Sequence, residues 1–176
     1  MKLRCKVGGA RNTFPEPHSA AISSALDNAF GPDQNWEDAA SREFGEMSES
    51  GIGKLQELAS ATLGIESIAN LSAMGSDGRC VYLPAYVRAI NLSFAAGKSL
   101  RCASLPGLRR ELSDLAARQG LPIDDESLRD LLEEAQTSDE NYSCPPSEIA
   151  AYARLALAAN EAVRKDCPLW LVGGLD

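Results

Sequence analysis

The chain has 176 residues, of which 44% are hydrophobic and 24% charged, and its formal net charge is −8. This composition is typical of a globular protein and argues against general disorder. Negative charge repels the phosphates of nucleic acids, so we expect no direct nucleic-acid binding. The apolar stretches are far shorter than the roughly 18 residues that a transmembrane helix needs, so we expect no membrane partner.

The N-terminus and the cysteines indicate a reducing compartment. Residues 1–7 alternate basic and apolar side chains, so the continuous apolar segment of a signal peptide is missing and we expect a cytoplasmic protein. The five cysteines form no CxxC pair, which argues against zinc and thioredoxin-like sites. We interpret them as small buried side chains. The alternative is that Cys144 and Cys167, each followed by proline, are exposed and reactive.

Helical spacing of apolar residues dominates the first half of the chain, and proline and glycine mark several element ends. Pro17 and Gly31 bracket a helix over 17–30. Asn35 is typical of the cap of a second helix, and further helices are predicted over 54–63 and 66–74. The apolar face of the second helix would consist of Trp36, Ala40, Phe44 and Met47.

The second half of the chain predicts four more helices. A stripe of Leu83, Val87, Ile90 and Phe94 predicts the central helix of the core. Ser104 is typical of a helix cap, and the helix that it opens would end at Gly120. Two further helices would begin at Asp124 or Asp125 and at Pro146, the last one extending to Lys165 with Val163 in its buried stripe.

Only residues 3–7 and 169–172 have a strand-like pattern. We therefore expect a mainly α-helical single domain over residues 1–176. Its architecture would be a compact bundle of about seven or eight helices. At most, the two strand-like segments would pair the termini in a small two-stranded sheet.

The sequence contains no motif for catalysis, cofactor binding or metal binding. The single histidine, His18, opens a helix, and we assign it a surface or structural role, with a general base as the alternative. The glycines at 8–9 and 51–53 lack the remaining residues of a phosphate-binding loop. We accordingly expect no enzyme activity, no cofactor and no metal.

Negative charge concentrates in residues 124–140, which hold eight carboxylates against the single Arg129, a net charge of −7. Like charges four residues apart on a helix, such as Asp130 and Glu134, cost a few tenths of a kcal/mol unless a cation opposes them. Three interpretations follow: a solvated face, a surface for a basic protein, or a divalent-metal site. The absence of EF-hand spacing disfavours the metal site.

Residues 78–86, Gly-Arg-Cys-Val-Tyr-Leu-Pro-Ala-Tyr, resemble a Tyr-Leu-Pro-Ala-aromatic segment of small bacterial immunity-type proteins. The resemblance implies a protein that neutralises a toxin, and it carries over no functional residue.

We predict a non-enzymatic inhibitor that sequesters a basic toxin or nuclease domain through this acidic helix. One alternative is a small helical enzyme that uses buried carboxylates among Asp125, Glu126 and Asp130. The other is a phage-type inhibitor that mimics DNA. The predicted partner contacts are Asp124, Asp125, Glu126, Asp130, Glu133 and Glu134, with Tyr142 and Trp170 as apolar anchors.

Overall fold

The computed structural model describes all residues except 1, 33–38, 75–78, 96, 137–145 and 174–176. The described residues form six α-helices, two short 3₁₀ turns and a six-stranded mixed sheet, so the predicted mainly α-helical bundle is wrong. In chain order the elements are β1 (Lys2–Val7), α1 (Ala10–Thr13), α2 (His18–Phe30), β2 (Arg42–Ser48), α3 (Glu49–Leu63), η1 (Ile65–Ser67), η2 (Leu71–Ala73), β3 (Arg79–Leu83), β4 (Ile90–Ala95), β5 (Lys98–Ser104), α4 (Leu105–Gln119), α5 (Asp125–Gln136), α6 (Ser147–Lys165) and β6 (Leu169–Val172).

The strand order in the sheet is β2-β1-β6-β3-β5-β4. Neighbouring strands are antiparallel except for β3 and β5, which are parallel. The two strand-like segments at the ends of the chain do pair, with Arg4 opposite Val172 and Val7 opposite Leu169. They are inner strands of the six-stranded sheet, however, and do not form a separate two-stranded one.

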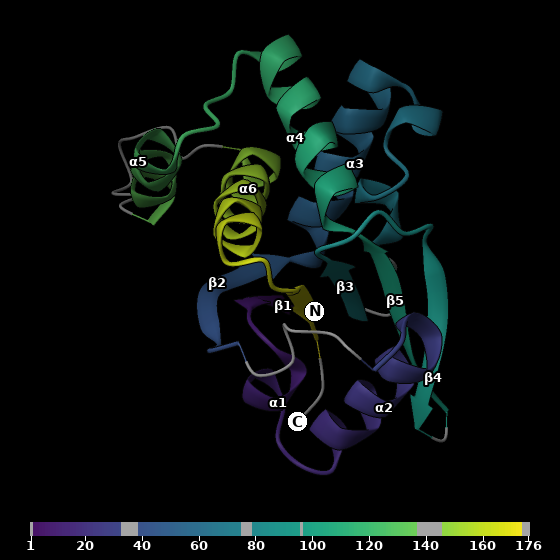
Figure 1. The fold of residues 1–176 in the computed structure, drawn as a ribbon. Helices are drawn as coiled ribbons and strands as arrows, with labels where there is room; N and C mark the ends of the chain where they lie inside the picture. Colours follow the sequence, from purple (N-terminus) through teal and green to yellow (C-terminus); the bar gives the residue numbers. More distant parts are fainter. Residues whose placement is uncertain (1, 33–38, 75–78, 96, 137–145, 174–176) are drawn as a thin grey trace.

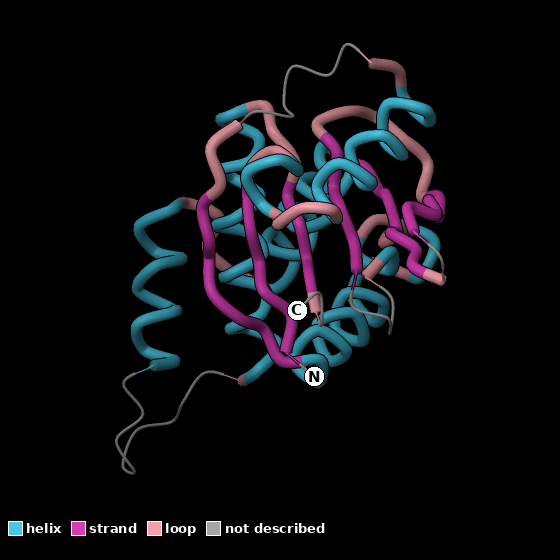
Figure 2. Tube along the Cα trace, turned by 90° about the horizontal axis from the view of Figure 1, so that it is seen from below, coloured by secondary structure: helices cyan, strands magenta, loops and turns pink. Residues whose placement is uncertain are grey.

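Helices lie on both faces of the sheet. Figure 1 shows α3, α4 and α6 over one face and the short α1 with α2 over the other. Helix α5 packs against α6 and lies at the periphery of the molecule, away from the sheet. Seen from below in Figure 2, the strands run side by side between these two helical layers. The buried side chains of the sheet and the helices form one continuous hydrophobic core.

The expected central helix is replaced by strands β3 and β4. Every side chain from Cys80 to Leu83 is buried, because β3 lies between two helical layers. A strand buried on both faces has a continuous apolar run that also fits a helix. In β4, Leu92 and Phe94 are partly buried while the residues between and beside them are exposed, which is the two-residue period of a strand.

The expected second helix is also wrong where the structure describes it. Phe44 and Met47 lie on β2, and Met47 pairs with Leu3 of β1. Its predicted start at Asn35 lies outside the described residues. The predicted helix over 66–74 is instead two separate 3₁₀ turns, η1 and η2.

The remaining five predicted helices are confirmed as α2, α3, α4, α5 and α6, although α3 starts earlier than expected. Their ends follow local chemistry. The Ser48 and Ser104 hydroxyl oxygens accept backbone N–H bonds at the starts of α3 and α4. Gly120 ends α4 with φ of 65°, a left-handed conformation that glycine adopts without a Cβ clash.

Candidate functional site

Helix α5 presents most of the predicted acidic contacts on its outer face. Leu128 and Leu132 are buried on the side that packs against α6. Because an α-helix has 3.6 residues per turn, the side chains opposite these two leucines share one face. The exposed carboxylates on that face are Glu126, Asp130, Glu133 and Glu134.

The first two predicted acidic contacts serve the protein itself. The Asp124 carboxylate accepts the backbone N–H of Ser127 at 2.9 Å, and this bond lowers the pKa of Asp124. Asp125 accepts from Asn160 at 2.8 Å and from Arg164 at 2.6 Å. Desolvation alone would raise the pKa of Asp125, but these two partners outweigh it and lower the pKa. Asp125 thus links α5 to α6 within the protein, and its predicted contact with a partner stays a prediction.

Trp170 is not an exposed anchor, so that prediction is wrong. Its side chain is 0% exposed, on the inner strand β6. The indole N–H donates to the Gly8 carbonyl at 2.7 Å, and the Phe14 ring packs edge-on with its centroid 5.0 Å away. Trp170 therefore joins the two ends of the chain in the core. The second predicted anchor, Tyr142, lies outside the described residues.

Two apolar side chains that the sequence did not single out as contacts are exposed beside α5. Ile123, just before the helix, is 45% exposed, and Val163 of α6 is 47% exposed. The Asn160 amide donates to the Ile123 carbonyl at 3.0 Å, and Val163 lies about one turn further along α6. The sequence placed Val163 in the buried stripe, which the structure corrects. The sequence signal for the exposure of Ile123 was its position outside the apolar stripes of the predicted helices.

The carboxylates named for the enzyme alternative do not meet in a cavity. Glu126 and Asp130 are exposed, and Asp125 is bound by Arg164. The buried carboxylates of the described chain are instead Glu111 and Glu161, and both are engaged within the protein. Glu111 accepts three N–H groups from Asn70 and Leu71, and Glu161 pairs with Arg42, Arg164 and Lys165.

The glycines at the end of β1 do not form a phosphate loop. The Gly8 N–H donates to the Pro168 carbonyl at 3.0 Å, and the Gly9 N–H donates to the Ala39 carbonyl at 2.9 Å. Both N–H groups are therefore occupied by the chain.

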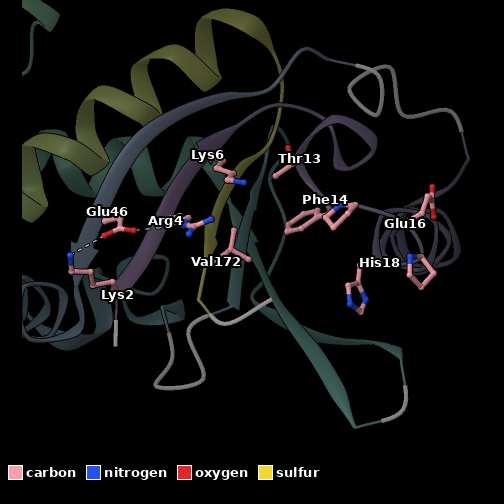
Figure 3. A pocket seen from close by; sticks show the side chains of 11 residues that line it. Lys2, Arg4, Lys6, Thr13, Phe14, Glu16, His18, Glu46 and Val172 are labelled. Atoms are coloured by element: carbon pink, nitrogen blue, oxygen red, sulfur yellow. Dashed lines mark ion pairs between the residues drawn. The ribbon is translucent and has the colours of Figure 1, made fainter. Parts of the chain in front are cut away.

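A second candidate site is a cleft of about 550 Å³ on the face of the sheet that carries α1 and α2 (Figure 3). Leu3, Cys5 and Val7 of β1 are buried towards α6, so the alternate residues of the strand point to the opposite face. The remaining lining comes from β2, β6 and the α1–α2 connection. We call this site the basic cleft; it is lined by Lys2, Arg4, Lys6, Thr13, Phe14, Pro15, Glu16, Pro17, His18, Glu46 and Val172.

Glu46 lies between two of the cations of the basic cleft. Its carboxylate is 3.1 Å from the Lys2 ammonium and 3.7 Å from the Arg4 guanidinium (Figure 3). The hydrogen bond with Lys2 is the main cause that lowers the pKa of Glu46. The alternation of basic and apolar residues over 1–7 is the sequence signal for this site, although by itself it indicates only a strand and the absence of a continuous apolar segment.

The connection between α1 and α2 forms the opposite wall of the basic cleft. Phe14 is nearly buried, and His18 is half-buried at the start of α2. The His18 Nε2 atom lies 3.4 Å from the Lys98 ammonium, and its ring meets the edge of Phe94. Since an ammonium group only donates, Nε2 is the acceptor in this contact. His18 thus has a structural role and also borders the cleft.

Comparisons with protein-family models, curated proteins and solved structures gave no match. Within the described part of the chain, no group of three or more His, Cys, Asp or Glu side chains is arranged to hold a metal ion. None of the described helices combines the length and the apolar character needed to cross a bilayer. The candidate sites are therefore argued from the residues of this chain.

Proposed function

We propose that this protein is a cytoplasmic, non-enzymatic inhibitor that sequesters a positively charged protein, such as a toxin or nuclease domain, through α5. The observation that supports the proposal is a set of exposed carboxylates on one face of a peripheral helix. Among the described residues, Glu126, Asp130 and Glu134 form no ion pair with a basic side chain. We call these three carboxylates, together with Ile123, the α5 surface.

A basic partner would relieve a repulsion that the free protein carries. Glu126 and Asp130 are four residues apart on the helix, as are Asp130 and Glu134, so each pair is unfavourable by a few tenths of a kcal/mol. The concentrated negative field would also attract a basic protein and accelerate its association. Ile123, three residues before Glu126 in the chain, would add exposed apolar area near the charges.

The distribution of charge favours a protein partner over DNA mimicry. A DNA mimic needs carboxylates spread across its surface at phosphate-like spacing. Here the acids of α5 form one dense patch on the outer side of α6, and the basic cleft lies on the opposite face of the sheet.

The proposal is tested by neutralising the α5 surface and comparing capture of proteins from the native host. The test variant is Glu126→Gln with Asp130→Asn and Glu134→Gln. The matched control is Glu57→Gln with Glu66→Gln and Asp114→Asn, which removes the same charge from exposed acids on α3, η1 and α4.

A basic protein retained by the wild type and by the control, and lost by the α5 variant, would support the proposal. Once purified, that protein should associate with the α5 variant about tenfold more slowly at low salt, and the difference should shrink as salt is raised. Equal capture by the α5 variant and the control would refute the assignment.

A further inference from the structure

The basic cleft carries a local charge opposite to that of the whole protein. Its lining holds three cationic side chains, Lys2, Arg4 and Lys6, and two carboxylates, Glu16 and Glu46, whereas the chain has a net charge of −8. Glu46 is shared between Lys2 and Arg4. The cleft is therefore positive although the protein as a whole is acidic.

Lys6 lies opposite Glu43 of β2 in the sheet but forms no ion pair with it among the described residues. It is half-buried, and no carboxylate of the described residues lies within ion-pair distance of its ammonium group. A partly desolvated ammonium is stabilised by a nearby anion more strongly than an exposed one, because the local dielectric constant is lower. Figure 3 shows the Lys6 side chain between Arg4 and Thr13 in the cleft.

A fourth cation extends the same row of the sheet. Val172, which lines the cleft, pairs with Arg4 on β1 and with Arg79 on β3, so the three side chains share one face. The Nε atom of Arg79 is buried and forms no hydrogen bond with the described residues. An anionic group beside the cleft would satisfy this donor.

The geometry points to a small dianionic ligand in the basic cleft, with phosphate or carboxylate groups at both ends and an apolar middle. Alternate residues of a strand are about 7 Å apart, so Arg4 and Lys6 would hold anionic groups at about that separation. Phe14 and Val172 supply apolar surface next to them. The cavity volume of about 550 Å³ is typical of sites for small molecules.

The test uses two probes that carry an anionic group at each end of an apolar four-carbon chain, butane-1,4-diyl bisphosphate and adipate; we call both dianions. Inorganic phosphate serves as a singly anchored reference. Binding is measured by calorimetry on the wild type, on Lys6→Gln and Arg4→Gln, and on Lys54→Gln. Lys54 is an exposed lysine on α3, so its replacement removes the same charge far from the cleft. His18 is the only histidine of the chain and borders the cleft, so its NMR signal reports directly on occupation.

At least one dianion should bind the wild type and Lys54→Gln equally, shift the His18 signal, and bind more tightly than inorganic phosphate. Its Kd should rise about tenfold in Lys6→Gln and in Arg4→Gln, in line with the loss of one charge-assisted contact. Which dianion binds better distinguishes a phosphate ligand from a carboxylate ligand.

Absence of binding by both dianions, an unshifted His18 signal, or equal affinity in Lys6→Gln would overturn the inference. Lys6→Arg keeps the charge and should retain binding, which separates loss of the contact from loss of the fold. The triple variant of the α5 surface should bind the same dianion as the wild type does. The experiments therefore test the ligand site and the proposed partner surface independently.

Discussion

Replacement of Glu111 by glutamine should strongly lower the unfolding free energy of the protein, although the two side chains have almost the same shape. Glu111 on α4 is 4% exposed. One carboxylate oxygen accepts the Asn70 backbone N–H at 3.0 Å and its side-chain amide at 2.7 Å, and the other accepts the Leu71 N–H at 2.8 Å. Asn70 in turn accepts from Ser104 N–H and from the Tyr82 hydroxyl. This network fixes the start of α4 to the η2 turn and to strand β3.

The size of the effect follows from the donors around Glu111. In either orientation, the new amide group of Glu111→Gln points a donor at a backbone N–H that has no other acceptor in the network. Loss of one hydrogen bond to a charged acceptor costs about 1.5–3 kcal/mol. The remaining bonds weaken as the charge disappears, so we expect a total loss of about 3 kcal/mol of unfolding free energy.

Urea unfolding at neutral pH, followed by circular dichroism, measures this loss. Glu57→Gln, the same change at an exposed position of α3, should stay within about 0.5 kcal/mol of the wild type. Asn70→Ala completes a double-mutant cycle, and its coupling with Glu111→Gln should be about 1 kcal/mol or more because the two side chains are bonded. A loss below about 0.5 kcal/mol in Glu111→Gln, or additive effects in the cycle, would refute the reasoning.

Three further predictions concern the core, an ion-pair cluster and the thiols. Gly8→Ala should lower the unfolding free energy by about 2–4 kcal/mol in the same assay, because φ is 149° and a Cβ would lie 2.7 Å from a backbone atom; an unchanged midpoint would contradict this. The hydrogen bond with Lys165 is the main cause that lowers the pKa of Glu161, so its carboxylate stabilises the fold above the unfolded pKa of about 4.3, and this contribution disappears as pH falls through the folded pKa. Urea unfolding of wild type and Glu161→Gln should therefore converge as pH falls below the folded pKa of Glu161, and a difference that stays constant with pH would argue against it. Burial raises the pKa of Cys5 and Cys102 to about 12 and that of Cys167 to about 11, so Cys144→Ser should show no native thiol reactive towards Ellman's reagent at about pH 8; rapid native labelling would disprove the burial.

One of the two candidate sites, the acidic face of α5, could be predicted from the sequence. The density of carboxylates after Asp124 located the outer face of α5, because charge and helical period are both local properties. The sequence did not reveal that Asp125 is bound by Arg164, since the two residues lie on different helices. Prediction of the basic cleft requires two observations together. One is the alternation of basic and apolar residues along β1, and the other is the position of the α1–α2 connection opposite that strand, which only the fold shows.

The five longer helices follow from local features of the chain. A serine cap such as Ser104, a terminal glycine such as Gly120 and an apolar stripe act within a few residues of one another. The strands depended on distant partners. The segment from Leu83 to Phe94 fits a helix about as well as it fits strands.

Long-range pairing within the sheet selects the strands over the helix. Strand β3 exists because β6 and β5 supply hydrogen-bond partners for its backbone, and β1 pairs with β6 from the other end of the chain. The buried Trp170, bonded to Gly8 at a separation of 162 residues, depends on the same pairing. Helix hydrogen bonds connect residues four apart, whereas strand hydrogen bonds join segments that local sequence does not relate. Five helices were therefore predictable, but of the sheet only the pairing of the two terminal strands was.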